Sequence, residues 1–203
     1  MAPERPPEML QIVRESLNGG AEAAYRAIEE DAARICADQG CPNAHLALES
    51  LTGPREVWWL TPYASESDRQ RVLRGYATNP ALMSALEEIP RRKRDLVGPP
   101  TDILATWRGD LGRETSWTLH GTRFLVVTVT KGDPAVAGAV FEAPDGTRFV
   151  FRAARTREEA DRLAGEPSGD TTVLAVRPYL GMPAKDWIAA DPEFWKPNPM
   201  AGR

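Results

Sequence analysis

The segment Glu56-Val-Trp-Trp-Leu60 constrains the fold of this chain more than any other stretch. Successive side chains of a β-strand point to opposite faces, so Val57 and Trp59 share one face while Trp58 and Leu60 share the other. Both faces are apolar, and a sheet with one face in water would leave a tryptophan exposed. We therefore expect one face to lie beneath helices and the other against a second apolar layer. That layer is either a later part of this chain or another copy of it.

The sequence around this strand has the order β-α-β-β-α-β. Strands are predicted at residues 9–16, 45–51, 56–60 and 102–107, with helices over 21–38 and from 66 onward. Asn18 is the expected N-cap of the first helix, and Ser65 is the expected cap of the second. The second helix should break at Asn79-Pro80, where Asn79 caps a continuation with proline at its first position. This order is typical of a ferredoxin-like unit.

A second β-rich unit follows. Strands are predicted at residues 123–130, 139–142, 147–153 and 171–176, with a helix opened by the capping box Thr156-Arg-Glu-Glu159. In this second unit, residues 131–138 are too few to form the helix that follows the first strand of a ferredoxin-like unit. The predicted fold is therefore α+β, a ferredoxin-like half followed by a second, degenerate half, with the sheets packed as an α/β barrel. The expected units are a flexible arm (1–7), a ferredoxin-like domain (8–108), a connector (109–122), the second half (123–180) and a helical tail (181–203).

Composition narrows the function classes. A net charge of −4 argues against a dedicated nucleic-acid binder, and no apolar run approaches the roughly 20 residues of a membrane span. The first residues lack the basic and apolar regions of a secretory signal, which predicts a cytoplasmic protein. Cys36 and Cys41 lack partners at zinc-ligand spacing and are expected to be structural thiols. No nucleotide, nucleophile-elbow or metalloprotease motif is present, so we expect no metal and no cofactor.

The element order over residues 8–108, with the strand Glu56-Val-Trp-Trp-Leu-Thr-Pro-Tyr63 leading into a Ser65-capped helix, resembles the dimeric α/β barrel superfamily. This superfamily includes antibiotic biosynthesis monooxygenase-like proteins. The resemblance implies two ferredoxin-like sheets facing each other, and several members act on aromatic polyketide-like or haem substrates, some without metal or flavin. A tandem chain would form the barrel internally. The helical histidine of the haem-degrading members has no counterpart here, so haem chemistry is not carried over.

The space between the two sheets is the expected cavity. If Leu46 and Leu48 lie beneath the helices, His45 and Glu49 point into that space, although four strand positions, about 13 Å, separate them. Arg14 on the first strand and Thr106 or Trp107 on the fourth are further lining candidates. The pattern leaves open which parity faces inward.

His45 is the candidate catalytic base, because histidine titrates near neutral pH. Trp58, Trp59 and Trp107 are candidates to hold an aromatic substrate, with Arg14 and Glu49 as further substrate-binding residues. A strand histidine is more often structural, and strand aromatics, including Tyr63 and Tyr76, are more often core. His120 is a weaker candidate, and the run Arg91-Arg-Lys-Arg94 is expected to be a solvated helix end rather than a phosphate site.

Three functions remain open from the sequence. The leading hypothesis is a small-molecule-binding α/β-barrel protein acting as a cofactor-independent, monooxygenase-like enzyme on an aromatic substrate. The alternatives are a noncatalytic structural protein with a filled barrel and a ligand carrier with an inert one. A small-molecule ligand and a homodimer are the partners considered, with no nucleic acid or membrane.

Overall fold

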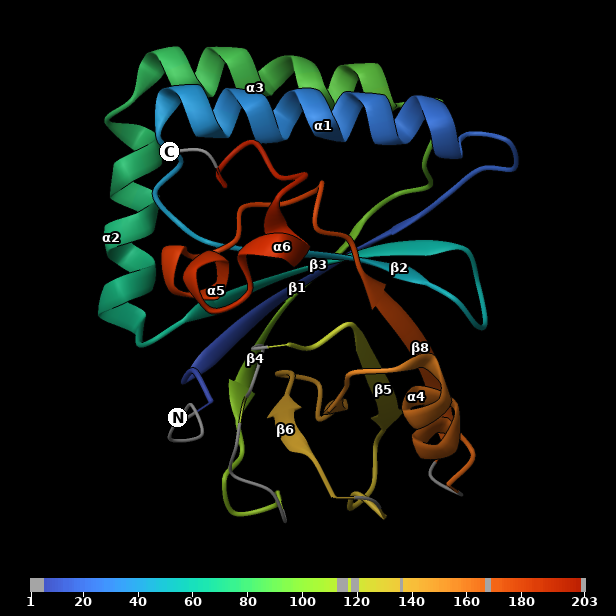
Figure 1. The fold of residues 1–203 in the computed structure, drawn as a ribbon. Helices are drawn as coiled ribbons and strands as arrows, with labels where there is room; N and C mark the ends of the chain where they lie inside the picture. Colours follow the sequence, from blue (N-terminus) through green and yellow to red (C-terminus); the bar gives the residue numbers. More distant parts are fainter. Residues whose placement is uncertain (1–5, 113–116, 118–120, 136, 167–168, 202–203) are drawn as a thin grey trace.

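Eight antiparallel strands close into a barrel in the computed structural model, which describes residues 6–112, 117, 121–135, 137–166 and 169–201 (Figure 1). The strands are β1 Met9–Ser16, β2 Leu46–Ser50, β3 Glu56–Tyr63, β4 Thr101–Trp107, β5 Phe124–Thr130, β6 Ala139–Glu142, β7 Arg148–Ala154 and β8 Asp170–Val176. Their order is β1-β3-β2-β8-β5-β7-β6-β4, and β4 pairs with β1 to complete the barrel. The first four strands therefore lie in the order β4-β1-β3-β2, and the last four lie in the equivalent order β8-β5-β7-β6. The predicted α+β barrel is confirmed at this level.

Helices are concentrated on the first four strands. They are α1 Glu22–Gln39, α2 Glu66–Ala77, α3 Pro80–Lys93, α4 Arg157–Ala164, α5 Lys185–Ala190 and α6 Pro192–Trp195. In Figure 1, α1 and α3 run side by side across the top, α2 descends at one side, and α5 and α6 lie in front of the barrel. Between β5 and β6 the described residues form no helix, as the short 131–138 stretch predicted.

Three of the four predicted helix caps are confirmed. The side chains of Ser65, Asn79 and Thr156 accept hydrogen bonds from backbone N–H groups three residues further along. The prediction for Asn18 is wrong, because α1 begins only at Glu22, after Ala21. The Asn18 side chain instead donates to the carbonyl of Asp95, and its backbone N–H donates to Leu96. Tertiary pairing of this turn outweighs the local capping preference.

The barrel interior holds the main core. Trp58 lies here, fully buried and edge-on to Phe149 of β7 with 6.4 Å between ring centroids. Leu46 and Leu48 of β2 belong to the same apolar cluster. The prediction that Trp58 and Trp59 lie on opposite faces, one against a second β layer and one beneath helices, is confirmed.

Candidate functional site

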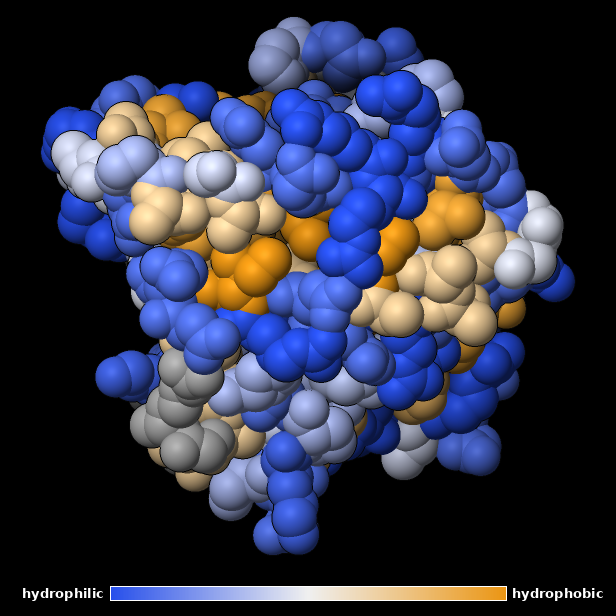
Figure 2. Space-filling model, turned by 90° about the horizontal axis from the view of Figure 1, so that it is seen from above, coloured by the Kyte–Doolittle hydropathy of each residue, from blue (hydrophilic) through white to orange (hydrophobic). Residues whose placement is uncertain are grey.

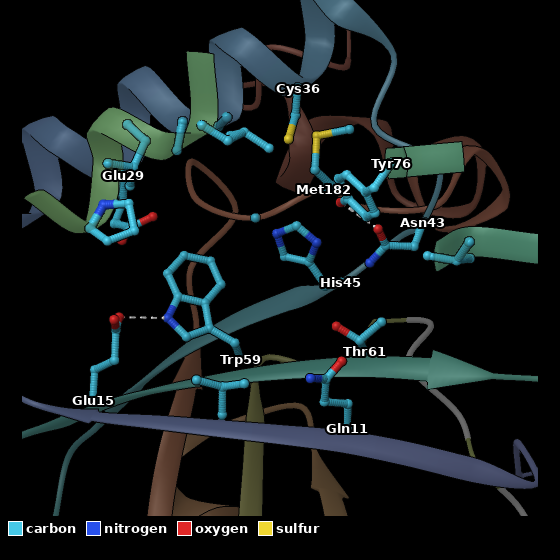
Figure 3. Close-up of a pocket in the computed structure, with 18 of the residues that line it drawn as sticks. Gln11, Glu15, Glu29, Cys36, Asn43, His45, Trp59, Thr61, Tyr76 and Met182 are labelled. Carbon is cyan, nitrogen blue, oxygen red and sulfur yellow. Dashed lines mark hydrogen bonds between the residues drawn. The ribbon is translucent and has the colours of Figure 1, made fainter. Parts of the chain in front are cut away.

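A cavity of about 410 Å³ lies on the outer face of β1, β3 and β2, beneath α1, α2 and α3 (Figure 3). Strand alternation supplies its floor: Gln11, Val13 and Glu15 of β1 pair with outward-facing residues of β3, among them Thr61 and Trp59. The helices supply an apolar roof that includes Ala33, Val72 and Ile89. The molecular surface on the side of α1 and α3 is mostly hydrophilic, with apolar patches between hydrophilic residues (Figure 2).

The position of this cavity corrects the prediction from the sequence. Leu46 and Leu48 point into the barrel rather than beneath the helices, so His45 and Glu49 do not point between the sheets. The two faces of β3 are both apolar, and the alternation pattern could not tell which one the helices cover. The cavity beneath α1–α3 lies between the sheet and the helices and not between two sheets.

His45 occupies the middle of the cavity wall. Its backbone forms a bridge with Met182, donating its N–H to the Met182 carbonyl at 2.8 Å and accepting the Met182 N–H at 3.0 Å. Gly181 has a left-handed φ of 74°, and a Cβ there would lie 2.8 Å from the His45 carbonyl oxygen, so only glycine lets this segment approach. The segment after β8 therefore fixes the position of His45.

The imidazole of His45 faces Trp59. Their ring centroids lie 5.6 Å apart in an edge-on arrangement. Burial lowers the pKa of His45 to about 4, so the ring is neutral at pH 7. Among the described residues no side chain donates a hydrogen bond to this imidazole or accepts one from it. A neutral ring of this kind can accept a proton or a hydrogen bond from a bound molecule.

One end of the cavity holds a buried charged cluster, which we define as Glu15, Tyr25, Glu29 and Lys93. Lys93 Nζ lies 2.7 Å from Glu15 Oε1 and 2.5 Å from Glu29 Oε1. Glu15 Oε2 accepts hydrogen bonds from the Tyr25 hydroxyl at 2.5 Å and from Trp59 Nε1 at 3.1 Å. None of the four side chains has more than a small exposed fraction.

The pKa values in this cluster follow from burial and from the shared ammonium. Burial raises the pKa of Glu29, and the adjacent Lys93 ammonium only partly opposes this effect. For Lys93, burial alone would lower the pKa, but Glu29 and Glu15 outweigh it and raise the value. The pKa of Tyr25 is raised by burial and by the same two carboxylates. Lys93 therefore carries its charge, and Tyr25 keeps its proton.

The other end of the cavity is neutral and polar. Tyr76 donates its hydroxyl proton to Asn43 Oδ1 at 2.7 Å, and Tyr63 donates to Gln11 Oε1 at 3.0 Å. Thr61 lies beside Gln11 on the strand floor. Burial raises the pKa of Tyr76 to about 12, so its hydroxyl stays protonated. These amides and hydroxyls suit hydroxyl or carbonyl groups of a ligand.

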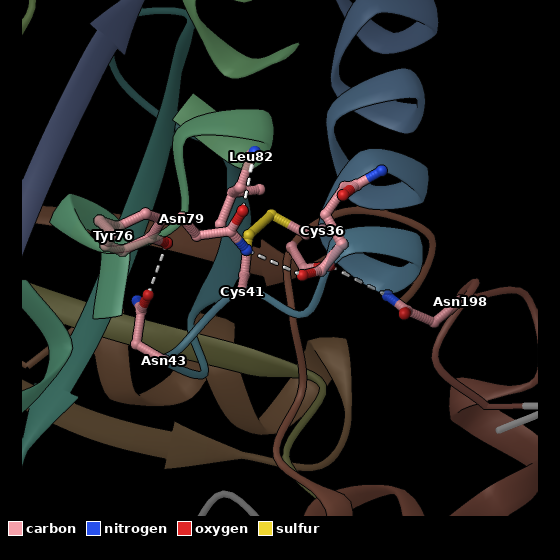
Figure 4. Close-up of a disulfide and its surroundings, with 9 residues drawn as sticks. Cys36, Cys41, Asn43, Tyr76, Asn79, Leu82 and Asn198 are labelled. Atoms are coloured by element: carbon pink, nitrogen blue, oxygen red, sulfur yellow. Dashed lines mark hydrogen bonds between the residues drawn. A yellow bond between two sulfur atoms is a disulfide. The ribbon is translucent and has the colours of Figure 1, made fainter. Parts of the chain in front are cut away.

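Cys36 and Cys41 form a disulfide at the C-terminal end of α1, so the expectation of two structural thiols is wrong (Figure 4). Cys36 also lines the cavity. The disulfide ties α1 to the segment that carries Asn43 and His45 into β2. Asn79 supports the same region by donating its side-chain amide to the Gln39 carbonyl at 3.2 Å. The chain turns at the end of α1, and this turn brings the two sulfur atoms together. The prediction considered only the spacing of metal ligands and did not consider a disulfide between the two cysteines.

Several residues predicted for the site lie elsewhere. Trp58 fills the barrel interior, and Trp107 packs against the same core, so neither borders the cavity. Arg14 forms an ion pair of 2.8 Å with Glu56 and lies over the Trp58 ring.

Glu49 pairs with Arg177 at 2.5 Å and is outside the cavity lining. Thr106 is exposed on β4, also away from the cavity. His120 lies outside the described residues. Of the predicted set, His45 and Trp59 are brought together, and Tyr63 and Tyr76 join them.

The buried cluster was missed, although the sequence carried a signal for it. The prediction that the run Arg91–Arg94 is a solvated helix end is wrong for Lys93, which continues the apolar stripe of α3 after Leu82 and Ile89. Glu29 similarly lies one turn after Tyr25 on the buried face of α1. A charged residue in register with an apolar helical stripe indicates burial.

Comparisons with known proteins support the fold and not a specific activity. A candidate monooxygenase from Fusobacterium nucleatum superposes with a TM-score of 0.51 at 9% identity, over 83% of this chain and 91% of that one. A candidate monooxygenase from Lactobacillus acidophilus gives a TM-score of 0.48 at 8% identity, over 85% and 94% of the two chains. A NIPSNAP-family protein of unknown function from Agrobacterium tumefaciens gives 0.38 at 19% identity, over 59% of this chain and 98% of that one. No family model and no curated protein matches the sequence.

The first of these similarities, at 9% identity, supports the barrel fold alone. Two further findings concern metal binding and membrane-spanning helices. Within the described ranges, no group of three His, Cys, Asp or Glu side chains is placed to hold a metal ion. No helix in the part of the chain that the structure describes is long and apolar enough to cross a membrane.

Proposed function

We propose that the cavity between the sheet and α1–α3 binds a flat, largely apolar small molecule whose ring lies against Trp59 and His45. The observation that carries this proposal is a neutral imidazole and a partly exposed indole facing the same apolar cavity. The cavity volume of about 410 Å³ is within the range of small-molecule sites. Aromatic rings favour edge-on and offset contacts with such side chains.

The polar groups at the neutral end orient the molecule. Asn43 and Tyr76 present an amide and a hydroxyl group there, which match a phenolic hydroxyl or a carbonyl on the ligand. Apolar walls with a few fixed polar groups are typical of sites that select both shape and orientation.

Binding can be tested with a naphthol probe and isothermal titration calorimetry. We expect Trp59→Leu to weaken naphthol binding by about tenfold or more, because an aromatic contact and buried area are lost. Glu49→Gln is the matched control, since Glu49 lies outside the cavity, and its affinity should equal that of the wild type. Equal affinity of all three proteins, or no binding to any, would overturn the proposal.

A second candidate function is oxidation of the bound molecule by dioxygen without a cofactor. It is favoured by His45, an imidazole inside the cavity that forms no side-chain hydrogen bond with the described residues. His45 would take a proton from an activated methylene of a hydroxylated aromatic ketone, and the resulting carbanion would reduce dioxygen. The balanced reaction is R₂CH₂ + O₂ → R₂C=O + H₂O, in which the substrate supplies all the electrons.

Oxygen uptake with a dihydroxyanthrone tests this second function. Wild-type protein should consume dioxygen above the rate of the protein-free solution, and His45→Ala should return uptake to that rate. Full activity in His45→Ala would remove the role of His45. Naphthol binding without oxygen uptake would leave a ligand carrier as the function.

A further inference from the structure

The charged residues around the cavity do not balance. Glu15, Glu29 and Lys93 are the charged side chains that line it in the described part of the chain. Two carboxylates thus share one ammonium, and with both ionised the cluster carries one excess negative charge. A buried charge without a partner is strongly unfavourable, so the cluster must take up a proton or a cation.

The two carboxylates differ in how fully they are bonded. Glu15 receives three donors, from Lys93, Tyr25 and Trp59. Glu29 contacts Lys93 through Oε1, and no hydroxyl, indole or backbone N–H of the described residues donates to its carboxylate. Glu29 is only 5% exposed and lines the cavity. The accepting capacity that remains in the cluster therefore belongs to Glu29 and faces the cavity.

We propose that Glu29 binds a positively charged nitrogen of the cavity's ligand, which makes the ligand an aromatic molecule carrying an alkyl ammonium group. This inference rests on the proposed function, because it names the chemical class of the molecule held against Trp59. In Figure 3, Glu29 and Glu15 lie at one end of the cavity and Trp59 lies between them and His45. An aromatic ring over Trp59 would thus place a short aminoalkyl chain at the carboxylates.

Charge decides between the classes of ligand. An ammonium group cancels the excess negative charge and forms charge-assisted hydrogen bonds to Glu29. An alcohol of the same shape forms a hydrogen bond but leaves the charge balance unchanged. A carboxylate would add a second excess negative charge beside Glu15 and Glu29.

Proton release provides an independent readout. In the empty cavity, burial raises the pKa of Glu29, and the groups that face it are Lys93 of α3, Glu15 of β1 and Tyr25 of α1. An ammonium ligand favours the ionised form of Glu29. Binding of the amine should therefore release protons, and its affinity should rise with pH until Glu29 is fully ionised.

The experiment uses tryptamine, tryptophol and indoleacetate, which share one ring and differ in charge. Calorimetric titrations of the wild type should show tryptamine binding at least about tenfold more tightly than tryptophol, and indoleacetate binding most weakly. Glu29→Gln should remove the preference for tryptamine while keeping tryptophol affinity within about twofold. Glu30→Gln is the matched control: it is the next residue of α1, pairs with Arg26 at 2.8 Å and lies outside the cavity lining, so the preference should persist.

The outcomes separate this inference from the proposed function. Equal affinity of wild-type protein for tryptamine and tryptophol would overturn the role of Glu29 and leave aromatic binding intact. Failure of naphthol, tryptamine and tryptophol to bind would overturn both. If Glu29→Gln does not fold, the wild-type titrations of tryptamine and tryptophol still decide, because equal affinities contradict the proposal.

Discussion

The two helix layers of the molecule meet the same barrel in different ways. Helix α4 packs directly on β5, β7 and β8, where Ala160 joins Val126 and Val173 in a small apolar cluster. Helices α1 and α3 pack along each other, and a cavity separates them from β1, β3 and β2. Small apolar residues allow α4 to pack closely on its strands. In the first layer the larger side chains of Trp59, His45 and Lys93 lie between the sheet and helices α1 and α3. Side chains between the layers, rather than barrel topology, thus decide where a cavity can exist.

The largest expected difference between the two layers concerns their buried cations. Lys93→Met leaves Glu15 and Glu29 buried without an ammonium and should reduce the free energy of unfolding by about 3–5 kcal/mol near pH 8. Arg152→Met in the second layer leaves Glu166, whose side chain is 41% exposed and keeps its ion pair with Arg162, and should change stability by less than about 1 kcal/mol. Urea denaturation of both variants measures the contrast. Equal losses would show that the layers do not differ in this respect.

Enlarging one alanine in each layer tests the difference in packing. Ala160→Leu adds volume where α4 is already packed and should cost about 1–3 kcal/mol. Ala33→Leu extends into the cavity, so stability should change by less than about 1 kcal/mol while naphthol affinity falls. Thermal unfolding and calorimetry give the two readouts. A stable Ala160→Leu variant, or unchanged naphthol binding by Ala33→Leu, would contradict this interpretation.

The disulfide is confined to the first layer, since the chain contains only two cysteines. It closes a loop with a sequence separation of 5, and removing it should lower the free energy of unfolding by about 2 kcal/mol. Denaturation of the Cys36→Ser/Cys41→Ser variant measures this loss. Wild-type protein with a reducing agent should match the variant, and the variant itself should not respond to the reagent. Identical wild-type curves with and without reductant would exclude a stabilising disulfide.

The last prediction concerns the acid sensitivity of the first layer. Burial lowers the pKa of His45 from 6.5 to about 4, so its contribution to stability is complete above pH 6.5 and is lost as the pH falls towards 4. The free energy of unfolding should therefore fall over this window, and less steeply in His45→Gln. The chain has two histidines, which makes their resonances in NMR titrations simple to follow. If neither imidazole titrates below pH 5, the burial of His45 is contradicted.

The sequence was sufficient for the barrel but not for the location of the cavity. Alternation in residues 56–60 predicted two buried faces, and both tryptophans lie where that argument requires. The same pattern could not say which face the helices cover, because both faces are apolar. Leu46 and Leu48 turned out to point inward, which reversed the expected direction of His45.

The charged cluster shows a second limit of reading local sequence. The charged neighbours of Lys93 in the chain predict an exposed side chain, but its environment is set by residues far away, Glu15 on β1 and Glu29 on α1. Its place on the stripe of Leu82 and Ile89 could have indicated burial. Which carboxylates it would meet depends on how α1 and α3 are placed over the sheet, and helical periodicity carries no such information.

Closure of the barrel within one polypeptide has a consequence for stoichiometry. Because β4 pairs with β1 and β8 pairs with β2, all the strands that carry the cavity floor are already hydrogen-bonded on both sides. This chain supplies both the floor and the roof of the cavity. A ligand titration should therefore saturate at one molecule per polypeptide, and dilution of the protein should leave that ratio unaltered.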